Sequence, residues 1–125
     1  MQMIAGLPVI PSAELMDQRE LSSGAFGKVL VAKRSGRGRV VVKTTKVGTL
    51  DRASIDKELR FLRDMSGHTN VARILALCLD LAGGDLGIVM DYCEYGSLKS
   101  FLRNFASVRS LVVMFIAWLH TLMLL

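Results

Sequence analysis

With 125 residues and a formal net charge of +5, the chain is long enough for one small domain and favours anionic partners such as nucleotides or lipid head groups. The basic residues are scattered and aromatic residues make up only 6%, which argues against nucleic acid as a partner. Cys78 and Cys93 both lie in apolar segments, so we expect reduced core thiols in an intracellular protein rather than a disulfide framework.

The chain begins with a segment that has no clear structural period. Residues 1–14 contain Pro8 and Pro11, and we expect a flexible leader there. The first ten residues lack a basic region and a long apolar core, so we expect no signal peptide. Residues 20–30, which include the stretch LSSGAFGKV, are predicted to form a hairpin between two short strands.

This hairpin carries two glycines and is followed by a strand that ends in a lysine. Gly24 and Gly27 leave backbone N–H groups uncovered by any Cβ, so phosphates can approach closely. Residues 39–43 (RVVVK) are predicted to form a strand with Val41 and Lys43 on one face, which places a point charge where phosphates could be held. The Gly-x-x-Gly spacing is unspecific by itself, and a tight hairpin without a ligand is the alternative.

An amphipathic helix is predicted over residues 50–65. Its apolar face is formed by Ile55, Leu59 and Leu62, and Phe61 and Met65 are predicted to widen this face. Glu58 falls on or beside this face, and an unpaired buried charge costs several kcal/mol. We therefore consider Lys43 as its ion-pair partner, while the alternative is that Glu58 lies at the edge of the apolar stripe and stays solvated.

Two more strands and a short helix follow. Residues 71–79 and 86–91 form apolar runs of strand length, and a helix over 97–103 is predicted with its first residue, a serine, as the N-cap. Residues 111–125 are almost wholly apolar, with His120 as the one ionisable residue.

Taken in order, these segments resemble the N-terminal lobe of a protein kinase. The glycine hairpin, the VVVK strand, the helix with an inward glutamate and residues 89–98 (VMDYCEYGSL) occur in the order of that family. The last segment is similar to the hinge of receptor tyrosine kinases, and residues 68–78 resemble the stretch leading into the fourth strand. The resemblance covers residues 15–103.

The resemblance implies an α+β fold, with a five-stranded antiparallel sheet, one regulatory helix and one or two C-terminal helices. It divides the chain into a leader (1–14), an N-lobe (15–92), a hinge with its following short helix (93–103) and an apolar C-terminal segment (104–125). That last segment would be a truncated helix of the C-lobe. The family commonly lies on the cytoplasmic side of the plasma membrane.

The resemblance also implies an ATP site. Gly24 and Gly27 would let the loop cover the phosphates, Lys43 would contact the α- and β-phosphates, and Glu58 would hold Lys43 in place. Other residues would hold the adenine, through side chains below it and through the hinge backbone at its edge. The implied nucleotide-binding residues are Ser22, Gly24, Gly27, Val29, Val41, Lys43, Glu58, Met90, Asp91, Tyr92 and Cys93.

Several departures from the family pattern limit these expectations. Ser22 stands where the first glycine is usual, and Val41 replaces an alanine beneath the adenine, which narrows the pocket. The sequence contains neither a His-Arg-Asp catalytic loop nor an Asp-Phe-Gly motif, so we expect no catalytic residue and no metal ligand in this chain, with Mg²⁺ bound only when a C-lobe is present. Residues 85–87 (DLG) imitate the second motif but precede the hinge, and are predicted to be a turn.

Two further questions stay open at this point. A non-catalytic interaction or decoy module, which binds a kinase or a substrate protein through its lobe and apolar tail, is the alternative to an ATP-binding lobe. Residues 111–125 would be a C-lobe helix stub, a product of alternative splicing or a shifted frame, or a membrane anchor. Fifteen residues are short for a span, which needs about twenty, so the anchor is the less favoured reading.

Overall fold

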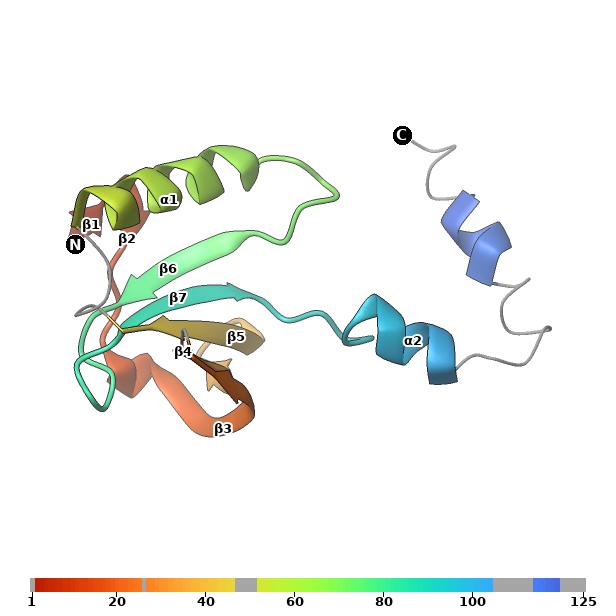
Figure 1. Ribbon diagram of the computed structural model, residues 1–125, viewed down its shortest axis with the longest axis horizontal. Helices are drawn as coiled ribbons and strands as arrows, with labels where there is room; N and C mark the ends of the chain where they lie inside the picture. Colours follow the sequence, from red (N-terminus) through yellow and green to blue (C-terminus); the bar gives the residue numbers. More distant parts are fainter. Residues whose placement is uncertain (1, 26, 47–51, 105–113, 120–125) are drawn as a thin grey trace. The chain divides into compact units, whose positions relative to one another are not determined.

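Strands rich in β-branched residues build the first of the two units into which the chain divides, Met1–Tyr92 and Cys93–Leu125. The computed structural model describes residues 2–25, 27–46, 52–104 and 114–119, with only the backbone of Arg52. Figure 1 labels the helices and strands of the chain.

A five-stranded antiparallel sheet with one long helix forms the first unit, which confirms the predicted fold class. The strand order is β3-β4-β5-β7-β6. The elements are β3 (Leu15–Gly24), β4 (Gly27–Arg34), β5 (Gly38–Thr45), α1 (Arg52–Met65), β6 (Ile74–Cys78) and β7 (Leu86–Asp91). Asp85 precedes β7 whereas Leu86 and Gly87 belong to it, so the DLG triplet is the end of a turn and the start of a strand.

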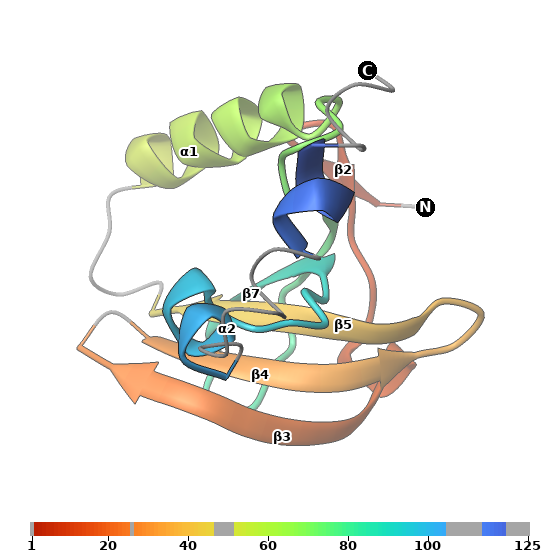
Figure 2. The same cartoon turned by 90° about the vertical axis from the view of Figure 1, so that its right-hand side faces the viewer.

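Apolar side chains fill both faces of this sheet. On one face, Leu59 of α1 packs with Leu77 and Ile88 of the two neighbouring strands β6 and β7. Figures 1 and 2 both show α1 lying across this face. On the other face, Val42 and Val89 belong to a second buried cluster. Because side chains alternate along a strand, successive residues of β5 point to opposite faces of the sheet, and Val40 and Val42 belong to this second cluster.

The leader is part of the packed structure, which differs from the flexible segment that its sequence predicts. It forms a small two-stranded sheet from β1 (Met3–Ile4) and β2 (Leu7–Pro8), followed by a 3₁₀ turn, η1 (Ser12–Glu14). Leu7 is 4% exposed and joins the cluster under α1, while Ile10 is 6% exposed and joins the opposite cluster. Burying these two side chains provides the free energy that holds an otherwise aperiodic segment in place.

Polar contacts fix the leader at three further points. The backbone N–H of Ile10 donates to the carbonyl of Leu77 at 2.8 Å, beside an isolated parallel bridge between Val9 and Leu77. The side chain of Arg63 on α1 donates to the carbonyl of Ala5 at 2.7 Å. The leader therefore contacts both the outer edge of β6 and the helix.

Ser12 and Asp80 make the third of these attachments. The backbone N–H and the hydroxyl of Ser12 donate to the two carboxylate oxygens of Asp80, at 2.8 and 3.1 Å. The Cys78 thiol also donates to this carboxylate, at 3.2 Å. The thiol contact, followed by the Ser12 N–H, lowers the pKa of Asp80, so the carboxylate keeps its charge and its bonds down to acidic pH.

The two cysteines are both free but lie in different environments. Cys78 is buried in the core, as predicted, whereas Cys93 is exposed and does not match the prediction of a core thiol. Burial, together with the hydrogen bond to Asp80, raises the pKa of Cys78 to about 11. Its thiol therefore stays protonated and covered at neutral pH.

Thiol labelling checks this difference. At pH 8 we expect Ellman's reagent to modify one thiol of the native chain, Cys93, and to reach Cys78 only after denaturant unfolds the core, because the reacting species is an accessible thiolate. The Cys93→Ser variant is the control and should show no native labelling. Rapid modification of two thiols in the folded chain would contradict the burial of Cys78.

The second unit contains helical segments. Ser97 caps α2 (Leu98–Asn104), since its hydroxyl accepts the backbone N–H of Ser100 at 3.1 Å, as the sequence predicts. Tyr95 packs edge-to-face against Phe101, with ring centroids 5.4 Å apart. Residues 114–119 are helical, and the rest of the predicted apolar tail lies outside the described residues. Within the described parts of the chain, no helix is long and apolar enough to cross a membrane.

Candidate functional site

A row of side chains on the helix-facing side of the sheet brings together four residues of the predicted site. Val29 lies directly opposite Lys43 in the β4–β5 ladder, and Val41 lies directly opposite Met90 in the β5–β7 ladder. Directly opposed residues of antiparallel strands point to the same face. Met90 packs against the cluster under α1, so all four side chains belong to the face that α1 covers in part (Figure 2).

The hairpin between β3 and β4 lies at the same end of the strands as Val29 and Lys43. Gly27 approaches β5 so closely that an added Cβ would overlap the carbonyl oxygen of Thr44, and its φ of +144° is a conformation that side chains disfavour. The neighbouring N–H of Lys28 donates to the Thr44 hydroxyl at 2.9 Å. The fold therefore requires a glycine at position 27. The contact with Thr44 was not predicted, because Thr44 belongs to no recognisable motif.

Gly24 and Ser22 lie on the other strand of this hairpin. Ser22 pairs with Val29 and Gly24 pairs with Gly27, and both Ser22 and Gly24 are exposed. Nothing lies within 4 Å of the position that a Cβ of Gly24 would take. The open side of the loop is thus at Gly24, where a ligand could reach the backbone.

Lys43 and Glu58 are not brought together in this conformation. Both residues are exposed, and no ion pair joins them among the described side chains. Leu59, the next residue of α1, takes the buried position at 2% exposure, which leaves Glu58 at the edge of the apolar face. Of the two alternatives that the sequence leaves open, the solvated glutamate is the one seen here.

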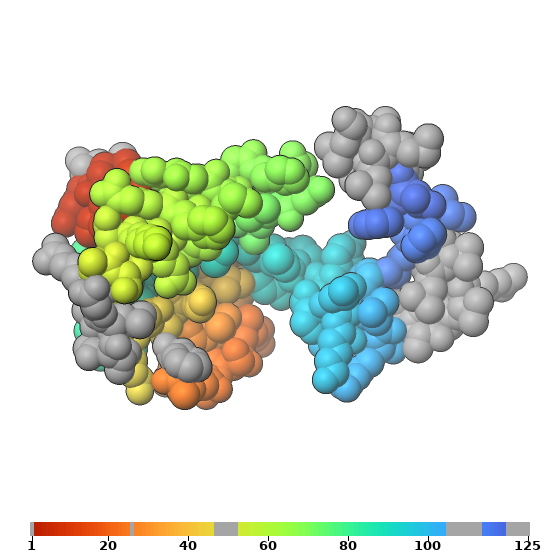
Figure 3. Space-filling view, turned by 45° about the horizontal axis from the view of Figure 1, so that its top comes forward, coloured from red at the N-terminus to blue at the C-terminus, as the bar shows by residue number. Residues whose placement is uncertain are grey.

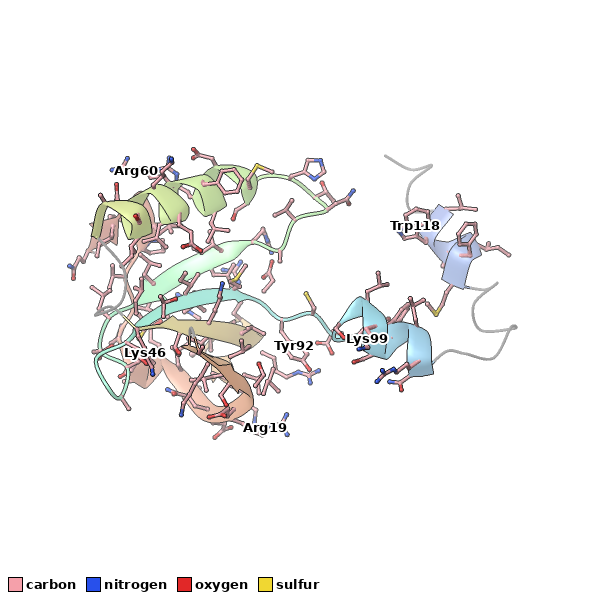
Figure 4. All side chains as sticks on the ribbon, viewed as in Figure 1. Arg19, Lys46, Arg60, Tyr92, Lys99 and Trp118 are labelled. Atoms are coloured by element: carbon pink, nitrogen blue, oxygen red, sulfur yellow. The ribbon has the colours of Figure 1, made fainter. Side chains whose placement is uncertain are left out.

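The predicted site residues at positions 91–93 lie at the end of β7 and directly after it. Asp91 ends β7, and its carboxylate accepts a hydrogen bond from Arg73 at 2.9 Å. Tyr92, which Figure 4 labels, follows Asp91. The guanidinium of Arg39 lies 4.6 Å from the centroid of the Tyr92 ring. Cys93 is next in the chain and begins the second unit. The partners Arg73 and Arg39 were not predicted, since nothing in their local sequence indicates a contact so distant along the chain.

One open hollow of the described surface borders Asp91, the residue that follows Met90. It has a volume of about 440 Å³ at the end of α1, and Ser66, His68, Arg73 and Asp91 are among its lining residues. Polar side chains dominate this lining, and none of the four row residues borders it. We therefore base the candidate site on the row and the hairpin.

The sequence of the chain matches a known protein family. A model described as protein tyrosine and serine/threonine kinase matches residues 15–118. The chain belongs to this kinase family. The matched region begins at the first residue of β3 and includes every element of the five-stranded sheet and α1.

The curated relatives of this kinase lobe include growth-factor receptors. The chain is 39% identical over 90 residues to macrophage colony-stimulating factor 1 receptor 2 of Takifugu rubripes. This match covers 66% of the chain and 9% of the relative. The chain is 36% identical over 91 residues to vascular endothelial growth factor receptor 3 of Danio rerio (66% and 7%), and 32% identical over 103 residues to platelet-derived growth factor receptor beta of Rattus norvegicus (76% and 9%). The chain spans less than a tenth of the length of these three relatives.

Proposed function

We propose that this kinase lobe binds ATP on the helix-facing side of its sheet. The Val29–Lys43 pair is the observation that carries the proposal, because it sets an apolar side chain beside an ammonium group at the end of the strands where the glycine hairpin turns. A nucleotide presents the matching features, a flat apolar ring joined to a chain of negative phosphates.

Each part of the site then has a chemical task. Lys43 attracts the α- and β-phosphates, and the open backbone at Gly24 lets the loop approach them. Val29 and Val41 form the apolar surface for the adenine, and Met90 limits how far the ring enters. The backbone of residues 91–93 supplies the hydrogen bonds at the adenine edge, as in the family.

Neither an ion pair between Glu58 and Lys43 nor a bound Mg²⁺ is part of the structure of the described residues. Pairing Glu58 with Lys43 requires a rearrangement, since the two are apart in this conformation. For Mg²⁺, the described residues hold no group of three or more acidic, histidine or cysteine side chains that could bind a metal ion. We therefore assign this chain no step that passes through Mg²⁺.

We further propose that this lobe is of the receptor-type tyrosine kinases, a family whose full-length members transfer phosphate from ATP to protein tyrosine, and that it lies on the cytoplasmic side of the plasma membrane. The receptor names of the relatives support this assignment. The chain by itself should transfer no phosphate, because its sequence holds neither a His-Arg-Asp nor an Asp-Phe-Gly motif.

Nucleotide titration tests the proposal. We expect the chain to bind ATP by calorimetry and the Lys43→Met variant to bind at least about tenfold more weakly, because the substitution removes a charge contact with the phosphates worth about 1.5–3 kcal/mol. In the same preparation, a tyrosine peptide with magnesium-ATP should gain no phosphate above background.

The Lys33→Met variant is the matched control for this titration. Lys33 lies on β4 at the opposite end from the hairpin, where it pairs with Asp17 at 2.9 Å, so its removal lowers the net charge equally without touching the row. Equal weakening by both substitutions would mean that ATP responds only to overall charge. No ATP binding by the unsubstituted chain would overturn the proposal.

A second candidate, a non-catalytic interaction module, is favoured by one feature of α1. Phe61 is 63% exposed and Met65 is 42% exposed, and both lie on the solvent side of the helix, whose outer surface is visible in Figure 3. Exposed apolar side chains of this kind mark protein contacts. Binding of a kinase or substrate protein that survives Lys43→Met and is lost in Phe61→Asp would support this candidate.

A further inference from the structure

The helical residues 114–119 are all apolar, so this helical segment has no polar face, and most of its side chains are exposed. The six residues are MFIAWL, and the exposed fractions of Phe115, Ile116 and Trp118 are 61%, 60% and 59%. A helix that is apolar all round is buried in a large core or in lipid, whereas a protein groove covers only one side of it. An environment that surrounds this helix fits its composition better than a flat or grooved partner.

The stretch of sequence before this helix carries basic residues but no acidic residue. After Glu94 the sequence contains Lys99, Arg103 and Arg109 and no aspartate or glutamate. The partner that complements this stretch is therefore anionic as well as apolar.

The side chains of α2 separate into an apolar edge and a basic edge. Leu98 is 71% exposed and Leu102 is 47% exposed, and the two are four residues apart on one side of the helix. Lys99 and Arg103, also four apart and both exposed, form the neighbouring edge. Figure 4 labels Lys99 on α2. A short helix with adjacent apolar and cationic edges matches the requirements of a membrane interface.

From these observations we propose that the second unit binds the surface of an anionic lipid bilayer. The apolar residues of 114–119 enter the head-group and acyl-chain boundary, and the basic edge of α2 contacts the acidic head groups. Spanning is not required: the six helical residues 114–119 rise about 9 Å, less than the ~30 Å hydrocarbon core, whereas interfacial binding has no such minimum. This inference does not depend on nucleotide binding by the first unit.

Trp118 offers a direct readout, because it is the only tryptophan of the chain (Figure 4). The full chain is titrated with vesicles of phosphatidylcholine alone and of phosphatidylcholine with roughly one third phosphatidylserine, at which the surface is strongly anionic. We expect the emission of Trp118 to shift to the blue and to be quenched by lipids brominated near the glycerol end of the chain. Partitioning to the anionic vesicles should exceed that to the neutral ones at least about tenfold.

Charge and apolar variants separate the two contributions. The Lys99→Glu/Arg103→Glu double variant should lose at least about 25-fold in partitioning to anionic vesicles, since one cation near the surface contributes about 1 kcal/mol, or about fivefold. Its control is Arg19→Glu/Arg37→Glu, two exposed arginines of the first unit, which should change partitioning less than twofold. Ile116→Asp should abolish the shift of Trp118, whereas Phe61→Asp, at a similarly exposed apolar residue of α1, should preserve it.

Two outcomes would overturn the proposal. One is an unchanged Trp118 emission with both kinds of vesicle. The other is an emission that is already blue-shifted in buffer and moves to the red on dilution, which would show that a second copy of the chain covers the helix. Sedimentation at the titration concentration identifies this second case independently.

Discussion

Replacing Gly27 with alanine should destabilise the first unit by about 2–4 kcal/mol, a large share of the 5–15 kcal/mol typical of a domain. Two effects act together. A φ of +144° is unfavourable for any residue with a Cβ, and the new methyl group would overlap the backbone carbonyl of Thr44. The carbonyl belongs to β5, whose strand pairs with both β4 and β7, so it cannot move away without disturbing the sheet.

Urea unfolding followed by circular dichroism measures this effect. Gly24→Ala is the matched control, because it changes the same hairpin at a position with nothing within 4 Å of the added Cβ. We expect the control to change the unfolding free energy by less than about 0.5 kcal/mol. Equal effects of the two substitutions would mean that the close approach of Gly27 to Thr44 does not exist in solution.

Substitution of the leader's two buried residues should have the other large effect. Leu7→Ala and Ile10→Ala should each cost about 2–4 kcal/mol, from lost transfer free energy and the cavity left behind. The two side chains belong to different clusters, one on each face of the sheet, so we expect the two costs to add. The double variant should therefore be largely unfolded at room temperature.

The exposed residue Met3 provides the control for the leader. It lies in β1 and is 50% exposed, so Met3→Ala should change stability by less than about 0.5 kcal/mol. A double variant as stable as this control would show that the leader is loosely held, as the sequence alone suggests.

Elements with a strong local signal were predictable from the sequence. The strand 86–91 has the predicted bounds, because a continuous apolar run lies between a turn and the hinge. The helix over 50–65 corresponds to α1, whose Leu59 is buried as its spacing predicts. The cap at Ser97 was also predictable, since a serine hydroxyl before a helix satisfies a free backbone N–H.

Features that depend on distant contacts were not predictable. The leader has no hydrophobic period, and its two short strands are held by contacts with Leu77 and Arg63, many residues away. For Glu58, helical spacing gives the angle around α1 but not the distance to Lys43, so either alternative was compatible with the sequence. In the candidate site, Val29 lies opposite Lys43. This pairing was not predictable because it depends on the register between β4 and β5, whereas alternation along one strand gives only the face to which each side chain points.

The bridge between Val9 and Leu77 has a consequence for aggregation. An outermost strand offers a row of unpaired N–H and C=O groups on which another chain can add a strand. At β6 this row is partly occupied by the leader, through the bridge and the hydrogen bond from Ile10. At the opposite edge, β3 is interrupted by two register shifts and carries Asp17, Arg19 and Glu20, which oppose such pairing. Loss of the leader would thus uncover the one apolar edge, and fibrillar or amorphous association through β6 is the expected result.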